Sequence, residues 1–529
     1  MNPPEADHSV ATESGIEMSA VETGPSSELQ GGHPAKTIAV ATTRSLDLEP
    51  GTVRREHDLL GEADVPVDAL WGIHTKRAVE NFPITGVPVG HFPELVRSLA
   101  LVKQAAARAN RRLGFLPAAK ADAIEAACQA IAEQGLHNDA FVVDAVQGGA
   151  GTSTNMNANE VIANVALRAM GFMPGDYAHM HPNDDVNMAQ STNDAYPTAL
   201  RLAIILATVP LQRALGDLAY AFKTKAVEFG DIIKMGRTQL QDAVPMTLGQ
   251  EFDAFHATIR EDVARLGEAA ALFREVNLGA TAIGTGINAD PRYAALAVEE
   301  LTRLSGQPMV LASNLIEATS DMGAFVLFSG VLKRVAVKIS KICNDLRLLS
   351  SGPRTGLAEI RLPPVQAGSS IMPGKVNPVI PEVVNQVAFL VIGHDLTVTL
   401  CAEGGQLQLN AFEPTIGYCI LNAMRMLTAA LDTLTHRCVE GIEADRERCE
   451  ALVHGSISIV TALGPALGYE TSSRIAKRAL AENRSVPEIV LEEGLMTRDE
   501  LDRLLELEAM THPSRSGSLQ QQKAASKQA

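Results

Sequence analysis

The chain has 529 residues, of which 46% are hydrophobic and 20% charged, a composition typical of a globular protein rather than a disordered or repetitive one. Its 45 basic and 62 acidic residues give a formal net charge of −17, which argues against a general nucleic-acid-binding surface. Aromatic residues make up only 4%, and this shortage favours helices over a β-rich fold.

Cysteine usage and the N-terminus indicate the compartment. The six cysteines are scattered, without the paired spacing of a zinc site or the density of a disulfide scaffold. The N-terminus lacks the apolar core of a signal peptide, and no stretch approaches the ~20 uninterrupted apolar residues needed to cross a bilayer. We therefore expect a cytoplasmic protein that binds neither nucleic acid nor a membrane.

Both ends of the chain lack the apolar periodicity of a folded domain. Residues 1–55 are rich in Ser, Thr, Gly, Pro, Glu and Ala, and residues 513–529 are rich in Ser, Gln and Lys. Such segments cannot bury enough apolar surface to offset the entropy of ordering them. The sequence predicts a disordered N-terminal extension and a flexible C-terminal tail.

Long amphipathic helices dominate the chain between these ends. From Asp321 to Leu349, apolar residues recur at alternating steps of three and four, which predicts a helix of roughly 43 Å that ends before a Gly-Pro pair. Similar apolar stripes occur at 211–222 and 252–266. A stripe of this length needs partners of matching length, so we expect a helical bundle.

Two further regions extend this pattern. The segment 383–392 is apolar around most of its circumference, as expected of a helix inside a bundle or an oligomer. Near the C-terminus, residues 485–488 and 497–500 each fit a capping box and predict two short helices. These shorter helices are expected to form a separate small domain.

Four stretches rich in Gly, Asn, Ser and Thr interrupt the helices. In the first, residues 148–157, glycines let the backbone approach a ligand while hydroxyl and amide groups offer neutral hydrogen bonds, although a capped helix start would explain the same pattern. In the second, residues 191–193 form a set of donors ahead of a helix, whose N-terminus favours an anion. Earlier in this stretch, His181 and Asp184 fit either a metal site or, more often, a hydrogen-bonded turn.

The third and fourth stretches add charged groups. Arg237, in residues 236–242, either binds a carboxylate or pairs with an acid and holds a turn, and the structural role is slightly favoured. Residues 368–378 form a shaped, partly mobile loop in which two serines, a lysine and an asparagine can face a small anion. Neither a Gly-x-Ser-x-Gly elbow nor a dinucleotide-binding Gly-rich turn is present, so esterase and dehydrogenase interpretations lack support. The inventory suits binding of a small carboxylate and stabilisation of an oxyanion.

The loop at 368–378 resembles the hallmark loop of the fumarase/aspartase superfamily, and the other three stretches match that family in the same order. The resemblance covers roughly residues 56–513. Within the superfamily it is closest to the aspartate ammonia-lyases, because fumarases typically have Gln at the position of Ser153 and His at that of Gln239. Loss of hydroxide from malate needs a proton donor, whereas an ammonium group already carries the proton with which ammonia leaves.

The resemblance implies an anti elimination with a serine base. Ser369, as alkoxide, takes a C3 proton from L-aspartate, an enediolate forms on the β-carboxylate, and the amine leaves to give fumarate. Loop closure must desolvate the site and surround this oxygen with donors, since a serine near its solution pKa could not act as the base. The implied substrate-binding residues are Thr152, Ser191, Thr192 and Ser370 for the β-carboxylate, Lys375, Asn377 and Thr238 for the α-carboxylate, and Asn193 for the amine, with Gln239 and Glu382 in support.

The same resemblance implies an all-α, three-domain fold whose long-helix bundle forms the helical core of a homotetramer, with each active site drawing on three subunits. The expected parts are a disordered extension at 1–55, an N-terminal lyase domain at 56–189, a central helical bundle at 190–444, a small helical domain at 445–512 and a flexible tail at 513–529. No required cofactor and no metal ligands are expected, and activation by a divalent metal stays open. The alternatives are a class II fumarase and a non-catalytic helical scaffold.

Overall fold

The computed structural model describes residues 51–512. The expected all-α class is confirmed, since helices account for most of these residues. The helices are α1 Ile73–Asn81, α2 Pro93–Leu113, α3 Ala118–Ala132, α4 Thr152–Ala169, α5 Thr192–Glu228, α6 Leu248–Ala270, α7 Tyr293–Ser305, α8 Leu315–Ser320, α9 Gly323–Leu349, α10 Val379–Glu403, α11 Glu413–Arg437, α12 Arg446–Gly455, α13 Val460–Leu467, α14 Tyr469–Glu482, α15 Val486–Glu492, α16 Arg498–Leu504 and α17 Leu507–Thr511. The strands are β1 Val53–Asp58, β2 Gly61–Pro66, β3 Ile233–Thr238, β4 Gln241–Thr247, β5 Glu275–Val276, β6 Val310–Leu311, β7 Ile360–Arg361 and β8 Glu443–Ala444.

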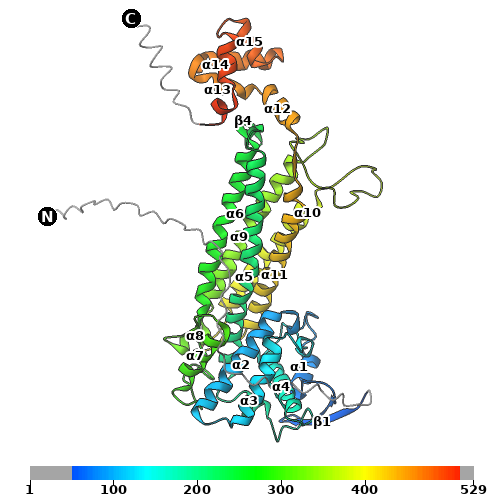
Figure 1. Cartoon of the computed structure of the whole chain (residues 1–529), viewed down its shortest axis with the longest axis vertical. Helices are drawn as coiled ribbons and strands as arrows, with labels where there is room; N and C mark the ends of the chain where they lie inside the picture. Colours follow the sequence, from blue (N-terminus) through cyan, green and yellow to red (C-terminus); the bar gives the residue numbers. More distant parts are fainter. Residues whose placement is uncertain (1–50, 513–529) are drawn as a thin grey trace, which may run out of the picture. The chain divides into compact units, whose positions relative to one another are not determined.

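Five long helices, α5, α6, α9, α10 and α11, lie side by side as a bundle (Figure 1). The predicted helix at 321–349 is α9, and every apolar residue of its stripe from Phe325 to Leu349 is buried. The stripes at 211–222 and 252–266 lie on α5 and α6, which pack against each other, and α6 also packs against α9. The predicted bundle is therefore confirmed.

Shorter helices pack around this bundle. α2 packs against α3, α5 and α7, and their apolar residues join the same core as the bundle. A second, smaller core lies in the C-terminal segment between Val453 and Leu501, and Met235 of β3 belongs to it. The expected helix starts there are confirmed, because Ser485 and Thr497 cap α15 and α16, although only Thr497 forms the complete capping box.

Residues 51–512 also form four two-stranded sheets, which were not anticipated from the sequence. In the antiparallel β1–β2 sheet, the guanidinium of Arg54 donates to the carbonyls of Ala69 and Trp71, at 2.8 and 2.6 Å. These bonds hold the strand from Val53 onward, so the predicted order boundary near residue 55 was placed inside β1. The predictions for residues 1–50 and 513–529 fall outside the described residues.

Two helices of the described part, α5 and α10, are long and apolar enough to cross a membrane by length and composition alone, and the bent segment from Arg446 to Leu467 would be a third candidate if counted as one span. In the structure, 56% of the apolar window of α5 is buried, against 33% for α10. α5 is enclosed by α2, α6 and α11, so protein side chains cover much of its apolar surface. α10 packs against α9 and α11 and keeps an exposed apolar face.

A buried carboxyl group and a buried guanidinium lie in the bundle. Burial raises the pKa of Glu413 on α11 to about 8, although the charge of Arg201 on α5 opposes this shift. Burial lowers the pKa of Arg201, whose guanidinium stacks over the ring of Phe325, 5.2 Å from its centroid. A carboxyl with a raised pKa binds its proton more tightly in the folded than in the unfolded state. The contribution of the Glu413 carboxyl to the free energy of unfolding is therefore complete below about pH 4.5, and it is lost as the pH rises through about 8.

Replacing this carboxyl by an amide tests that sign. The variant Glu413→Gln cannot ionise, so its melting temperature relative to the native chain should rise between pH 5 and pH 8.5, by at least about 2 °C. Circular dichroism melts of both proteins across this range measure the difference. A difference that stays constant or shrinks with rising pH would contradict the shift in pKa.

Candidate active site

The donors expected at residues 191–193 form the N-terminus of α5. Ser191 caps this helix, since its Oγ accepts from the backbone N–H of Asn193 at 3.2 Å, and Asp194 completes a capping box. The Oγ1 of Thr192 accepts from the side-chain amide of Asn155 at 3.2 Å. Because both hydroxyl oxygens accept from the protein, their own protons remain available to donate to a ligand. The helix N-terminus adds to the attraction for an anion.

The side-chain amide of Asn193 is held in place through its nitrogen. Its Nδ2 donates to the carbonyl of Ala282 at 2.7 Å. The neighbouring Asp194 is buried and accepts from the backbone N–H groups of Gly279 and Thr281, at 3.0 and 2.9 Å, while burial raises its pKa to about 6. Fixing the nitrogen leaves Oδ1 as the group that can accept a hydrogen bond from an amine.

The segment that makes these contacts, residues 277–288, was missed in the sequence analysis. It wraps the start of α5, with the Nδ2 of Asn277 donating to the carbonyl of Asn193 at 3.0 Å. This segment contains a cluster of Gly, Thr and Asn like those of the four stretches described above. That composition is the sequence signal by which it could have been predicted as part of the site. Gly284 has a φ of +101° and a Cβ there would lie 2.4 Å from the backbone of Ile316, so only glycine fits.

Lys103 is a second group that the sequence analysis missed. It lies on α2, fully buried, and its Nζ donates to the side-chain oxygens of Asn155, Asn187 and Gln190, at 2.6, 2.9 and 2.9 Å. Three acceptors require three N–H groups, which only the ammonium form has. Burial nevertheless lowers the pKa of Lys103 to about 7, although the charge of Asp194 opposes this. Asn155 therefore links a buried positive charge to the hydroxyl of Thr192.

Thr152 occupies the first position of α4. Its side chain is exposed, and its Oγ1 donates to the carbonyl of Gly149 at 2.7 Å. The helix is capped by Gly151 without a side-chain hydrogen bond, so neither Thr152 nor Thr154 is the capping residue that would explain this stretch as a capped helix start. Through Asn155, one turn further along α4, this helix meets the start of α5. Thr152 and residues 191–193 thus belong to the same end of α5.

Thr238 and Gln239 lie at the turn of the β3–β4 hairpin. Thr238 pairs with Gln241, and the two residues between them, Gln239 and Leu240, have positive φ values of 54° and 62°. This is the backbone of a two-residue turn that normally selects Gly or Asn. Thr238, Gln239 and Leu240, which form the tip of the hairpin, are all exposed. Arg237 does not face them but pairs with Glu359 at 3.0 Å, which supports its structural role.

Ser369 lies in the loop between β7 and α10. Its Oγ accepts from the backbone N–H groups of Ile371 and Met372, at 3.3 and 3.1 Å. The amide of Asn377 donates to the carbonyl of Gly368 at 2.7 Å and closes the neck of the loop. At Gly368 a Cβ would lie 1.9 Å from the carbonyl of Lys375, so the loop requires glycine there.

The other predicted site residues in and after this loop are exposed at the surface. Ser370 and Lys375 are exposed, and Glu382 is exposed in the first turn of α10. None of the hydrogen bonds described for the loop involves their side chains. The loop therefore presents one serine held by two N–H donors, with a lysine beside it at the surface.

A single chain keeps these groups apart. Residues 191–193 begin α5, whereas the hairpin with Thr238 follows its other end, and the 37 residues of the helix span about 55 Å. The loop with Ser369 lies on the side of the hairpin, since Glu359 contacts both Arg237 of the hairpin and the end of α9 (Figure 1). The structure brings together Thr152 with residues 191–193, but not these with Thr238 or Ser369.

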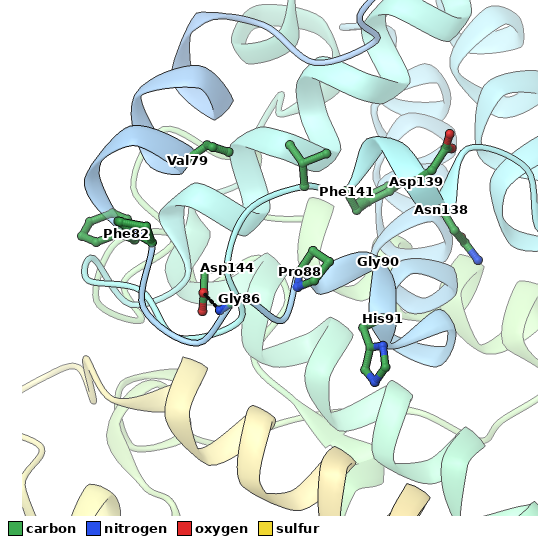
Figure 2. A pocket seen from close by; sticks show the side chains of 12 residues that line it. Val79, Phe82, Gly86, Pro88, Gly90, His91, Asn138, Asp139, Phe141 and Asp144 are labelled. Atoms are coloured by element: carbon green, nitrogen blue, oxygen red, sulfur yellow. Dashed lines mark hydrogen bonds between the residues drawn. The ribbon is translucent and has the colours of Figure 1, made fainter.

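The predicted site residues line neither of two cavities found among the described residues. A cavity of about 610 Å³ lies beside Gly86 and Asp144 (Figure 2), and none of the predicted site residues lines it. The carboxylate of Asp144 already accepts from backbone N–H groups of residues 85, 86 and 146. Within residues 51–512, no group of three or more His, Cys, Asp and Glu side chains is arranged to hold a metal ion. His181 accepts from the N–H groups of Asn183 and Asp184 and caps a turn.

Comparison with known proteins gives consistent relatives. A family model described as Lyase matches residues 61–393, and one described as Fumarase C C-terminus matches residues 459–512. The chain is 63% identical to the aspartate ammonia-lyase of Pseudomonas aeruginosa and 54% identical to that of Escherichia coli strain K12. Each alignment covers 87% of this chain and 97% of the relative.

Solved structures agree with these matches. A fumarate lyase:delta crystallin from Brucella melitensis bound to cobalt aligns with a TM-score of 0.85 at 60% identity, over 87% of this chain and all of that chain. A class II fumarase from Schistosoma mansoni aligns with a TM-score of 0.81 at 32% identity, again over 87% of this chain and all of that one. The chain belongs to the fumarase/aspartase superfamily.

Proposed function

We propose that this chain is a carbon–nitrogen lyase that eliminates ammonia from L-aspartate reversibly to give fumarate. The observation that carries this proposal is its identity of 54–63% to aspartate ammonia-lyases over 87% of its length. The turn of the β3–β4 hairpin agrees, because it presents Gln239 rather than an imidazole. An ammonium leaving group brings its own proton, so this position needs no proton donor.

Ser369 is the general base of the proposed reaction. The N–H groups of Ile371 and Met372 point at its Oγ, and such donors stabilise an alkoxide more than a neutral hydroxyl. In the structure this serine is half-buried within an exposed loop. Closure of the loop over the substrate would remove water and strengthen both hydrogen bonds. Ser369 then takes the C3 proton, and the charge moves onto the β-carboxylate as an enediolate.

The start of α5 binds the β-carboxylate in this proposal. The hydroxyls of Ser191 and Thr192 are oriented to donate, and Thr152 and Ser370 complete the set. Lys103 places a positive charge behind Asn155, where it stabilises the additional negative charge of the enediolate without contacting it.

The other two groups of the substrate are bound by separate elements. Asn193 accepts a hydrogen bond from the amine through its Oδ1. Lys375, Asn377 and Thr238 bind the α-carboxylate, with Gln239 and Glu382 in support. The lysine supplies the charge, and the amide and hydroxyl supply direction.

We propose that these groups meet in a homotetramer, with each active site built from three subunits. The support is geometric, because α5 separates residues 191–193 from Thr238 by about 55 Å. A face of α10 also lacks a partner in the described chain, and its exposed apolar residues recur at helical spacing as Phe389, Ile392, Leu396 and Leu400. A patch of this kind marks an interface between subunits.

The proposed chemistry uses only protein groups. It requires no cofactor, and a divalent cation enters only as a possible activator, which assays with and without a chelator will test. The substrate is a small molecule, and we place the enzyme in the cytoplasm, in keeping with its six free cysteines.

The first prediction concerns the substrate. Incubation with L-aspartate should produce fumarate, followed by its ultraviolet absorbance, whereas L-malate should produce none at the same enzyme concentration. Ser369→Ala should lower kcat on aspartate by at least about a hundredfold, because the base is removed while the binding groups remain. Fumarate from malate alone would favour a class II fumarase, and no fumarate from either would favour a non-catalytic scaffold.

The second prediction concerns Lys103. Lys103→Met keeps the length of the side chain but removes the charge, and kcat/KM for aspartate should fall at least about tenfold. Lys225→Met is the matched control. Lys225 is also buried, its Nζ donates a hydrogen bond to the carbonyl of Ile442, and it contacts no proposed site residue. Equal losses in both variants, in step with lost folded protein, would show that Lys103 only supports the fold.

The third prediction concerns shared sites. Chains carrying Ser369→Ala and chains carrying Thr238→Ala should each have low activity alone. Co-expressed with two different tags, mixed tetramers should recover activity, because about one quarter of sites in a random mixture combine both intact residues. Purification over both tags followed by the fumarate assay measures the recovery. Activity no higher than that of the better parent would mean that one chain supplies both residues.

A further inference from the structure

Four charged side chains form a cluster beneath the β3–β4 hairpin, outside the residues assigned to the site. Glu359 is fully buried, its Oε1 accepts from Arg237 at 3.0 Å, and its Oε2 lies 3.2 Å from the Nζ of Lys234. Lys234 is buried as well and donates to Glu251 of α6 at 2.5 Å. Two cations and two carboxylates thus balance, with Glu359 and Lys234 buried and Arg237 and Glu251 partly exposed.

The geometry of β3 makes this arrangement unusual. Lys234 and Arg237 lie three residues apart, and in a regular strand such side chains point to opposite faces. Here the pairing register shifts between Met235 and Arg237, where Gly236 stands opposite two residues of β4. Such a bulge increases the local twist of the hairpin, and both cations reach one carboxylate. Thr238 is the next residue after Arg237, so the direction in which it leaves the bulge depends on this contact.

Glu359 also connects the hairpin to the serine loop. Its backbone N–H donates to the carbonyl of Leu349, the last residue of α9, and its carbonyl accepts from the N–H of Asp445, just before α12. The chain then continues through β7 into the loop that carries Ser369. A single residue therefore binds the hairpin through its side chain and anchors the beginning of the loop segment through its backbone.

We propose that Glu359 is a positioning residue for the reaction, which sets the place of Thr238 through Arg237 and Lys234. The buried carboxylate holds both cations because an unpaired charge in this place is strongly unfavourable. The inference rests on the proposed function. If Glu359 acts through Thr238, its loss weakens binding of the α-carboxylate, and the effect disappears once the hydroxyl of Thr238 is gone.

The test is a double-mutant cycle on the tetrameric enzyme. Glu359→Gln keeps the shape of the side chain and removes its charge, and kcat/KM for aspartate should fall at least about tenfold, mainly through a higher KM. In a Thr238→Ala background the same change should cost no more than about twofold, because residues that act through one another are not additive. Glu251→Gln is the matched control: it removes the other carboxylate on Lys234, leaves Arg237 paired, and should change kcat/KM by less than about threefold.

Each outcome decides the inference, provided that tetramer mass and circular dichroism are recorded for every variant. Losses that multiply in the double mutant, equal losses in the Glu251 control, or an unchanged Glu359→Gln enzyme would overturn the positioning role alone. If Glu359→Gln does not assemble, Glu359→Asp carries the test, since it keeps the charge but shortens its reach; a loss that persists in the Thr238→Ala background overturns the role, and one that vanishes there supports it. A native chain that makes no fumarate from aspartate would overturn the proposed function and this inference together.

Discussion

The length of α5 is the constraint on which the rest of the structure depends. A helix of 37 residues carries its donor groups at the first turn and a hairpin beyond its last, so the two can never meet within one chain. A long helix also needs long neighbours, and α6, α9, α10 and α11 supply them. The exposed apolar face of α10 follows from the same geometry, because a bundle of this length has more apolar surface than one chain covers. Rigidity of the bundle then fixes the distance between sites in any assembly.

The second constraint is charge. The chain carries a net charge of −17, and its proposed substrate is an anion, so long-range electrostatics disfavour binding. The structure offsets this repulsion locally. It places oriented hydrogen-bond donors at the proposed site, together with cations whose own partners are uncharged groups or groups that already have all their hydrogen bonds. Lys103 donates to amide oxygens rather than to a carboxylate, so no ion pair neutralises its charge directly, although the charge of Asp194 acts on it. Lys234 and Arg237, in contrast, are neutralised by Glu359 and Glu251 and hold structure.

The sequence predicted what repeats or recurs, and it missed what depends on three-dimensional contact. Apolar periodicity located α9 and the bundle, and the capping pattern located α15 and α16. Lys103 was missed because it lies in an apolar helix, and only the fold shows that Asn155, Asn187 and Gln190, distant in sequence, surround its ammonium group. The β3–β4 hairpin was missed because its turn residues, Gln239 and Leu240, are not those that normally mark such turns. The choice of Arg237 as a structural residue could be made from sequence, but its partner Glu359, 122 residues away, could not.

That unusual turn connects stability with specificity. Gln239 and Leu240 both adopt left-handed backbone conformations, which cost of order 1 kcal/mol or more for residues other than glycine. Gly or Asn would remove much of this strain but would also remove the side chain that distinguishes this chain from the fumarase pattern. The exposed Leu240 beside it lacks a partner in the described chain and gains one if the turn enters a neighbouring subunit. The strain is therefore tolerated at a turn that must present a specific side chain outward. Glu359 meanwhile holds the strand β3, from which this turn projects, through Arg237 and Lys234.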